Sequence, residues 1–139
     1  MPPDEAFGFF ADAHNLEAIT PPWLGFEITT RGTIDMNAGT LISYRLRLHG
    51  LPVIWHTKIV AWDPGRRFVD TQLDGPYRLW HHTHDFEPVG TDETLMRDTV
   101  RYVLPLGALG DLAHALLVRR DLDRIFAFRR SAVAERMRP

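Results

Sequence analysis

The chain has 139 residues, a formal net charge of −2 and no cysteine. A chain of this length suits a single domain, residues 1–139, that buries about 70% of the surface of its unfolded form. Without cysteine, disulfides, thiolate metal sites and thiol nucleophiles are excluded. The balanced charge argues against nucleic-acid binding, which needs a concentrated basic face. The chain starts without a basic, apolar leader and has no run of about 18 apolar residues, so we expect a cytoplasmic protein without a membrane span.

Two short helices are expected first. Residues 4–14 carry acidic side chains in the first turn, where they complement the helix dipole, and apolar side chains along one side. Asn15 can cap a second helical turn over residues 16–20, which Pro21 and Pro22 end because proline cannot continue a helix.

Alternating apolar and polar residues then predict an antiparallel meander. The expected strands cover residues 26–35, residues 40–49, a segment from Pro52, residues 68–73, a central segment to Phe86, and residues 94–103. Gly50 and Leu51 are expected at the centre of a two-residue hairpin turn, which places Tyr44 opposite Thr57.

The central strand follows a Gly75-Pro76 turn and has an unusual face. Side chains two apart share one face of a strand, which groups Arg78, Trp80, His82, His84 and Phe86. Aromatic, cationic and imidazole groups together favour the wall of a ligand cavity over a plain core, since buried polar groups need partners.

After residues 105–110, a long helix is expected over residues 111–137, with an apolar stripe that suits packing across a sheet. The first half of this helix is also apolar outside the stripe, at Leu109, Ala113, Leu116 and Leu117. Cover by the loop around Trp23 is the default expectation, and a second subunit in a homodimer or a bound ligand are the alternatives.

Two short helices, a meander of about six strands and a long C-terminal helix make a layered α+β fold. This order of elements resembles the SRPBCC or START-like superfamily. Three segments carry the resemblance: FFADAHNLEAITPPW, FVDTQLDGPYRLWHHTHDFE and VLPLG. Within it, the chain is similar to the bacterial branch called polyketide cyclase/dehydrase-like or coenzyme Q-binding-like. The resemblance covers nearly the whole chain and implies a helix-grip fold, in which a curved sheet wraps around the C-terminal helix and leaves a deep cavity.

The start of the chain departs from that family. Relatives usually begin with a strand before the first helix, whereas this chain leads almost directly into the helix. Either the start codon is assigned late or the sheet lacks its usual first strand, which would leave unpaired backbone groups on a neighbour. We expect the late start.

Two histidines and an aspartate are the candidates for catalysis or metal binding. Asp98 interrupts an apolar strand face, and the expected registers place it roughly opposite His82. A carboxylate beside an imidazole raises the basicity of the ring, as a general base requires, although buried groups also pair simply to satisfy each other. His82 and His84 have the His-x-His spacing of some zinc sites. With Asp98 as the only convincing third ligand and no visible second shell, we expect no metal and no cofactor.

Nine further residues on the same inward faces are the expected ligand-binding set. The aromatic ones offer flat apolar surface to an aromatic or isoprenoid ligand. The polar ones can bind a carboxylate, hydroxyl or quinone oxygen, unless Asp70 and Arg78 pair with each other. The set is Trp55, Phe68, Asp70, Gln72, Arg78, Trp80, His84, Phe86 and Tyr102.

The expected function is binding of a hydrophobic small molecule, such as a lipid, a quinone or a polyketide-like ring system. One alternative is a cyclase or dehydratase, a lyase-type enzyme that uses His82 and Asp98 as acid and base. Another is a protein-interaction module that docks a partner on the apolar first half of the C-terminal helix. The resemblance does not choose among them, because one fold hosts many functions.

Overall fold

The computed structural model describes residues 1–104 and 112–138. In chain order its elements are α1 (Pro3–Ala11), α2 (Asn15–Ala18), the 3-10 turn η1 (Pro22–Leu24), β1 (Glu27–Ile28), β2 (Leu41–Leu48), β3 (Leu51–Asp63), β4 (Arg67–Asp74), β5 (Leu79–Pro88), β6 (Thr94–Val103) and α3 (Leu112–Arg136). The strands form one six-stranded sheet in sequence order, with every neighbouring pair antiparallel. The predicted α+β meander with a long C-terminal helix is confirmed.

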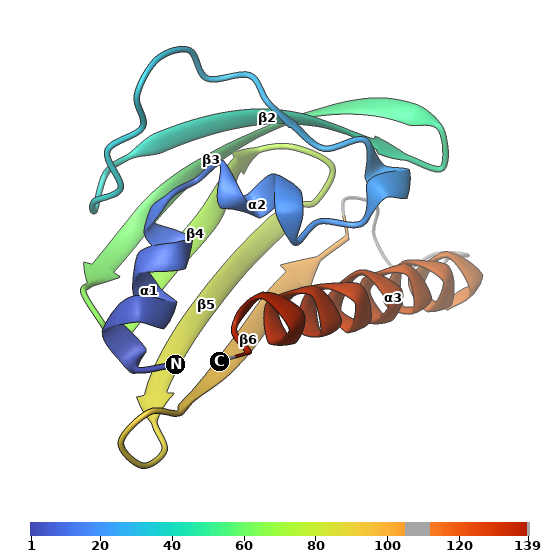
Figure 1. Cartoon of the computed structure of the whole chain (residues 1–139). Helices are drawn as coiled ribbons and strands as arrows, with labels where there is room; N and C mark the ends of the chain where they lie inside the picture. The colour runs from blue at the N-terminus through green and yellow to red at the C-terminus, as the bar shows by residue number, and fades with distance from the viewer. Residues whose placement is uncertain (105–111, 139) are drawn as a thin grey trace.

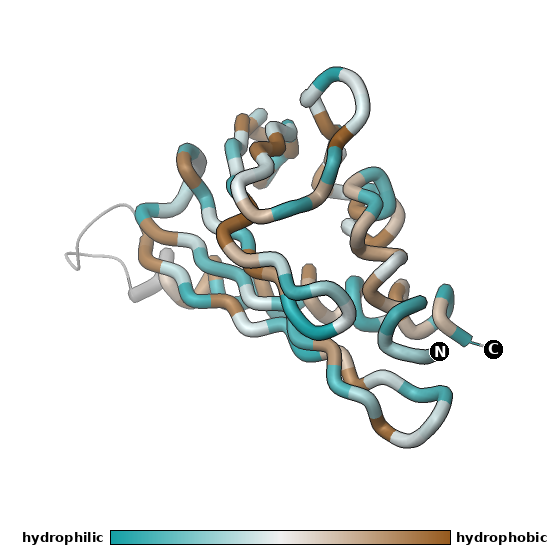
Figure 2. The backbone as a smooth tube through the Cα atoms, turned by 90° about the vertical axis from the view of Figure 1, so that its left-hand side faces the viewer, coloured by the Kyte–Doolittle hydropathy of each residue, from teal (hydrophilic) through white to brown (hydrophobic). Residues whose placement is uncertain are grey.

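The sheet curves, and all of the helices lie on its concave side (Figure 1). The turned view shows the same separation of helices from sheet, with hydrophobic and hydrophilic residues alternating along the strands (Figure 2). This alternation gives the sheet one buried face and one solvated face, as expected for an antiparallel sheet covered on a single side.

Aromatic side chains fix α1 to the sheet. Phe7 and Phe10 are buried and meet Phe86 edge to face, with ring centroids 5.2 and 5.4 Å apart. Phe68 contacts both α1 rings from β4, at 5.9 and 6.4 Å. These contacts make one half of the core.

A second apolar cluster lies between the middle of the sheet and the middle of α3. Trp55 and Trp80 form its centre, with their rings perpendicular at 5.2 Å, and the buried Leu24 and Leu46 complete it. Partly buried side chains of α3 pack against this cluster at Leu122, Ile125 and Phe126.

The first half of α3 is less well covered than the second. Ala132 and Arg129 are buried, whereas Leu116 and Leu117 are 58% and 44% exposed. We expected the loop around Trp23 to cover these two leucines. Instead, the Trp23 ring packs against Phe128 and lies beside Arg124, further along the helix. Leu109 and the expected turn over residues 105–110 lie outside the described residues.

The strand expected over residues 26–35 is wrong in its extent, because β1 contains only two residues. The backbone N–H groups of Thr29 and Thr30 both donate to the carbonyl of Ser43, which ends the regular ladder. Gly32 then adopts φ +81°, a left-handed conformation that turns the chain away from the sheet.

The turn of the β2–β3 hairpin lies one residue earlier than predicted, so each residue of β2 faces a partner two residues from the expected one. Its central residues are His49 and Gly50, with φ of +50° and +79°, so Tyr44 lies opposite Trp55 instead of Thr57. A two-residue turn that matches the strand twist needs positive φ at both central positions. A turn centred on Gly50 and Leu51 would have forced a leucine into that conformation, which is unfavourable for a residue with a Cβ.

Helix α1 also ends earlier than expected, at Ala11. Asp12 has extended backbone, and its side chain accepts a hydrogen bond from the backbone N–H of His14 at 3.0 Å, which favours a turn over further helix. Asn15 is the first residue of α2, and its side chain donates to the carbonyl of Phe9 at 2.7 Å, linking the two helices.

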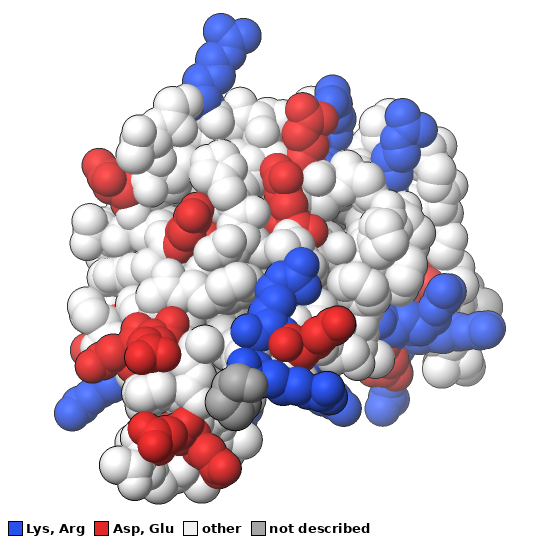
Figure 3. Space-filling model, in the orientation of Figure 1, with Lys and Arg blue, Asp and Glu red and all other residues white. Residues whose placement is uncertain are grey.

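The surface agrees with the small net charge, since acidic and basic side chains both occur on the face shown in Figure 3. Within the described ranges, no helix has the length and apolar character needed to cross a membrane.

Phe10→Ala should lower the free energy of unfolding by about 3–5 kcal/mol, because it leaves a cavity beneath α1. Leu51→Ala is the control, since Leu51 is 70% exposed and should change stability by less than about 0.5 kcal/mol. Urea denaturation measures both. Equal, small changes would show that α1 is not held by this aromatic cluster.

Candidate functional site

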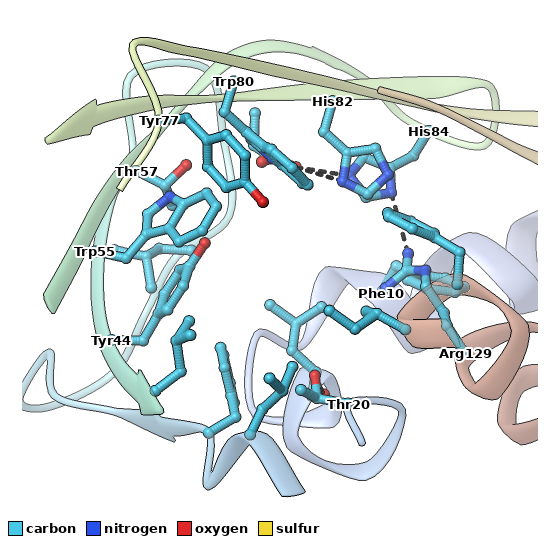
Figure 4. A pocket seen from close by; sticks show the side chains of 18 of the residues that line it. Phe10, Thr20, Tyr44, Trp55, Thr57, Tyr77, Trp80, His82, His84 and Arg129 are labelled. Atoms are coloured by element: carbon cyan, nitrogen blue, oxygen red, sulfur yellow. Dashed lines mark hydrogen bonds and ion pairs between the residues drawn. The ribbon is translucent and has the colours of Figure 1, made fainter. Parts of the chain in front are cut away.

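A cavity of about 170 Å³ lies between the concave face of the sheet and the helices. Aromatic and aliphatic side chains make most of its wall, and polar groups lie at two places (Figure 4). Its lining includes Phe10, Leu24, Tyr44, Trp55, Thr57, Phe68, Asp70, Tyr77, Trp80, His82, His84, Phe126 and Arg129.

Strand pairing brings two histidines and two aspartates together at one end of the cavity. Asp70 on β4 lies opposite His82 on β5, and Asp98 on β6 lies opposite His84. His82 Nε2 is 2.9 Å from Asp98 Oδ1, and His84 Nε2 is 2.6 Å from Asp70 Oδ2. The predicted contact between His82 and Asp98 therefore exists as a diagonal contact, since Asp98 lies opposite His84, two residues from the expected partner.

Arg129 of α3 completes this group. Its Nε donates to Asp98 Oδ2 at 2.9 Å, and its Nη2 donates to Asp98 Oδ1 at 3.3 Å and to His84 Nδ1 at 3.2 Å. Arg129 is only 9% exposed, and its guanidinium also lies 5.3 Å from the ring of Phe10. We call Asp70, His82, His84, Asp98 and Arg129 the polar cluster.

The hydrogen bonds assign the proton positions on the two imidazoles. His84 donates from Nε2 to Asp70, so its Nδ1 is free to accept from Arg129. His82 donates from Nε2 to Asp98, and its Nδ1 makes no hydrogen bond within the described residues; the nearest carboxylate oxygen, Asp70 Oδ2, is 3.8 Å away. The ring of His84 stacks on Phe68 with centroids 3.9 Å apart, and the His82 ring lies 3.7 Å from it, tilted by 31°.

The charges in the polar cluster set its protonation. Burial alone would raise the pKa of Asp98, but the Arg129 guanidinium and the hydrogen bond from His82 outweigh it and hold that pKa well below its usual range. For Asp70, burial is likewise outweighed by the hydrogen bond from His84 and by the proximity of His82, His84 and Arg129, so its pKa is lowered. Burial, with the neighbouring His84, lowers the pKa of His82 to about 4. At neutral pH both carboxylates are ionised and His82 is a neutral base.

A second polar region lies on the other side of the cavity. The hydroxyls of Tyr44 and Tyr77 point toward the open space in Figure 4, near Trp55 and Thr57. Burial and the charge of Asp70 raise the pKa of Tyr44 well above its usual value, and burial raises the pKa of Tyr77 to about 12. Both phenols therefore stay protonated and can donate hydrogen bonds.

Trp55 adds a further polar group to this region. Its Nε1–H is buried and has no hydrogen-bond partner among the described residues. A buried donor without a partner costs about 1–3 kcal/mol, so a ligand oxygen that accepts from it would relieve that cost. Thr57 offers less, because its hydroxyl already donates to the carbonyl of Thr71 at 2.9 Å.

The structure brings together part of the predicted site. Six of the candidates line the cavity: Trp55, Phe68, Asp70, Trp80, His82 and His84. Asp98 is not part of its lining and lies behind the two histidines, where it contacts both.

Four predicted ligand-binding residues lie elsewhere. Gln72 closes the β4–β5 turn through two hydrogen bonds to the backbone of Tyr77, and Arg78 is exposed and forms no ion pair with Asp70. Phe86 belongs to the core beneath α1, and Tyr102 packs against the outer side of the Tyr77 and Trp80 rings. None of these four residues is part of the lining of this cavity.

Sequence reasoning missed Arg129, Tyr44 and Tyr77. Arg129 could have been noticed as a charged residue one helical turn from Ile125 and Phe126, in the apolar stripe of α3. Strand alternation could not place Tyr77, because this residue lies in the turn that precedes β5.

A metal ion would find three convergent ligand atoms in the polar cluster. Asp70, His82 and His84 each offer one such atom, and these atoms all lie within 4.8 Å of one another. His56 does not join them, because it is exposed on β3 and hydrogen-bonds Ser43 at 2.6 Å.

Arg129→Met should lower the free energy of unfolding by about 3–5 kcal/mol, because it leaves the Asp98 carboxylate buried without its cation. Arg130→Met is the matched control, since Arg130 is the exposed neighbour and should change stability by less than about 0.5 kcal/mol. Asp98→Asn added to Arg129→Met should recover part of the loss. If denaturation shows no recovery, the loss came from packing and not from charge.

The sequence matches no family model and no curated protein significantly. Solved structures do match. TTHA0849 from Thermus thermophilus is 23% identical with a TM-score of 0.69, over 98% of this chain and 89% of that one. Major latex-like protein 151 from Panax ginseng is 15% identical with a TM-score of 0.67, over 99% of this chain and 90% of that one. The Zhui aromatase/cyclase from Streptomyces sp. R1128 is 18% identical with a TM-score of 0.66, over 99% of this chain and 89% of that one. The chain therefore shares the α+β helix-grip fold of these proteins.

Proposed function

We propose that the protein binds a small, ring-shaped hydrophobic molecule that carries oxygen atoms on opposite edges. The observation that carries this proposal is a mostly apolar cavity with hydrogen-bonding groups at two separate places. Pockets for small molecules usually combine an apolar wall with a few convergent polar groups.

The size of the cavity favours a compact ligand. An engineered protein cavity of about 150 Å³ holds one benzene molecule, and this cavity measures about 170 Å³. A one-ring or two-ring molecule therefore suits it better than a long lipid chain. The rings of Trp55, Trp80 and Tyr44 offer flat surfaces for stacking against such a molecule.

The polar groups favour oxygen substituents on that ring. At one side, the phenols of Tyr44 and Tyr77 and the indole N–H of Trp55 can donate to a carbonyl or hydroxyl oxygen. At the other side, His82 Nδ1 can accept from a ligand hydroxyl. Among the expected ligand classes, a polyketide-like phenolic or keto ring system fits this pattern best. One neighbour of the same fold is an aromatase/cyclase by name, which is consistent with a ring-shaped ligand here.

Calorimetry tests the proposal with two ligands. One is naphthalene, and the other is a dihydroxynaphthalene whose hydroxyls lie on opposite edges. Both should bind, and the diol more tightly. Trp80→Ala should weaken binding of both at least about tenfold, a loss of about 1.4 kcal/mol, while Trp23→Ala, which removes a half-exposed tryptophan outside the cavity, should not.

Tyr77→Phe gives a milder version of the same test. It should weaken the diol about fivefold, the value of one hydrogen bond of about 1 kcal/mol, and leave naphthalene unchanged. Binding that is the same in Trp80→Ala and Trp23→Ala, or no binding at all, would contradict the proposal.

A second candidate function is acid–base catalysis in the cavity. The hydrogen bond from His82 Nε2 to Asp98 supports it, since it orients the ring so that the free Nδ1 can take a proton from a bound ligand. His82 is neutral at physiological pH and can therefore act as a base.

Exchange of the α-protons of the two-ring ketone α-tetralone in D₂O measures this activity without a known substrate. The protein should accelerate exchange by at least about 100-fold, and His82→Gln or Asp98→Asn should abolish the acceleration. Asp121→Asn is the control, because Asp121 pairs with His49 on the surface. Exchange no faster than in buffer would exclude His82 as a base for such a ligand.

A further inference from the structure

We propose that Asp70, His82 and His84 bind a divalent transition-metal ion at the end of the cavity. The inference uses the cavity of the proposed function for access, but it depends on a different set of contacts.

The positions of the ligand atoms suit one ion. His84 Nε2 and His82 Nδ1 lie 2.6 and 3.8 Å from Asp70 Oδ2. Ligand atoms bound to one tetrahedral zinc ion at about 2.0–2.2 Å lie about 3.3–3.6 Å apart. Shifts of less than about 1 Å, which side-chain rotation can supply, would therefore bring both distances into range. The two imidazoles come from alternate residues of β5 and Asp70 from the paired strand β4, so a rigid sheet holds all three.

A shared outer carboxylate is the strongest indication. Asp98 Oδ1 is 2.9 Å from His82 Nε2 and 3.2 Å from His84 Nδ1, so one carboxylate contacts the remaining nitrogen of both candidate ligands. Metal-binding histidines characteristically donate their other N–H to a carboxylate, which fixes the ring and raises its basicity. Arg129 in turn holds Asp98 through both carboxylate oxygens. Metal binding requires His84 to move its proton from Nε2 to Nδ1, where Asp98 can accept it.

Charge and ligand type indicate the kind of ion. Two carboxylates and one guanidinium leave the polar cluster with one excess negative charge when both imidazoles are neutral, which a dication more than offsets. Two nitrogens and one oxygen suit zinc, cobalt, nickel or iron(II), whereas magnesium and calcium prefer oxygen ligands alone. Because Asp70, His82 and His84 all line the cavity, the open coordination positions face it, where an oxygen of the bound ring could reach the ion.

Calorimetric titration of the EDTA-dialysed protein with Zn²⁺ tests the site. The absorption spectrum of the protein with Co²⁺ in place of Zn²⁺ reports the coordination geometry. We expect one ion per chain, tetrahedral or five-coordinate Co²⁺ bands, and no binding of Mg²⁺. Asp98→Asn should weaken Zn²⁺ binding about 10–100-fold, as is usual when a metal-binding histidine loses its outer partner. His84→Ala removes a ligand itself and should weaken binding at least as much. His56→Ala, the exposed control on β3, should not weaken it.

Asp70→Asn keeps the site testable if His84→Ala fails to fold, because the amide preserves the shape of the side chain. It too should weaken Zn²⁺ binding strongly. Absence of stoichiometric Zn²⁺ binding, or binding that survives both His84→Ala and Asp70→Asn, would overturn the proposal.

The two proposals fail separately. Binding of dihydroxynaphthalene by EDTA-treated protein that takes up no Zn²⁺ would refute the metal site and leave the cavity function standing. Stoichiometric Zn²⁺ binding without diol binding would do the reverse. His82 Nδ1 serves both as metal ligand and as candidate base, so acceleration of proton exchange that Zn²⁺ suppresses would show that the two uses compete.

Discussion

The buried ion pair between Asp98 and Arg129 is the interaction on which the rest of the site depends. It joins the last strand of the sheet to the C-terminal helix, and it is the reason that two ionised carboxylates can lie inside an apolar fold. A buried pair of this kind contributes little net stability compared with apolar packing, but removing one partner is costly because the other stays buried and charged. Its role is therefore best understood as fixing the position of α3 and the protonation of the two histidines.

The chemical asymmetry of the cavity follows from that pair. Ionised Asp98 and Asp70 each accept a hydrogen bond from one imidazole, which leaves His82 Nδ1 as an unprotonated nitrogen at one end. Tyr44 and Tyr77 stay protonated at the other side because burial opposes their ionisation. The cavity thus presents an acceptor at one place and donors at the other, with aromatic walls between them. This arrangement, more than the fold, favours an oxygen-bearing ring, because the same fold holds many kinds of site.

Local sequence patterns predicted most of the strands, the inward faces of His82 and His84, and the contact between His82 and Asp98, because alternation and short turns are local properties. These patterns failed where the exact position of a turn decided the result. The turn at His49 and Gly50, one residue earlier than expected, shifted the β2–β3 partners by two residues, and Tyr77 enters the cavity from a turn instead of a strand. Arg129 could not be paired from sequence, since its partner Asp98 is 31 residues away and the angle of α3 on the sheet depends on packing.

The most direct test of this account is NMR of the imidazole nitrogens of His82 and His84 in ¹⁵N-labelled protein at neutral pH. The account predicts that each ring carries one protected proton on Nε2, that both signals move when dihydroxynaphthalene fills the cavity, and that Arg129→Met abolishes their protection. Rings whose N–H protons exchange with water as fast as those of the exposed His56, or signals that ignore a bound ligand, would contradict the claim that a buried, charge-paired cluster forms one end of the cavity.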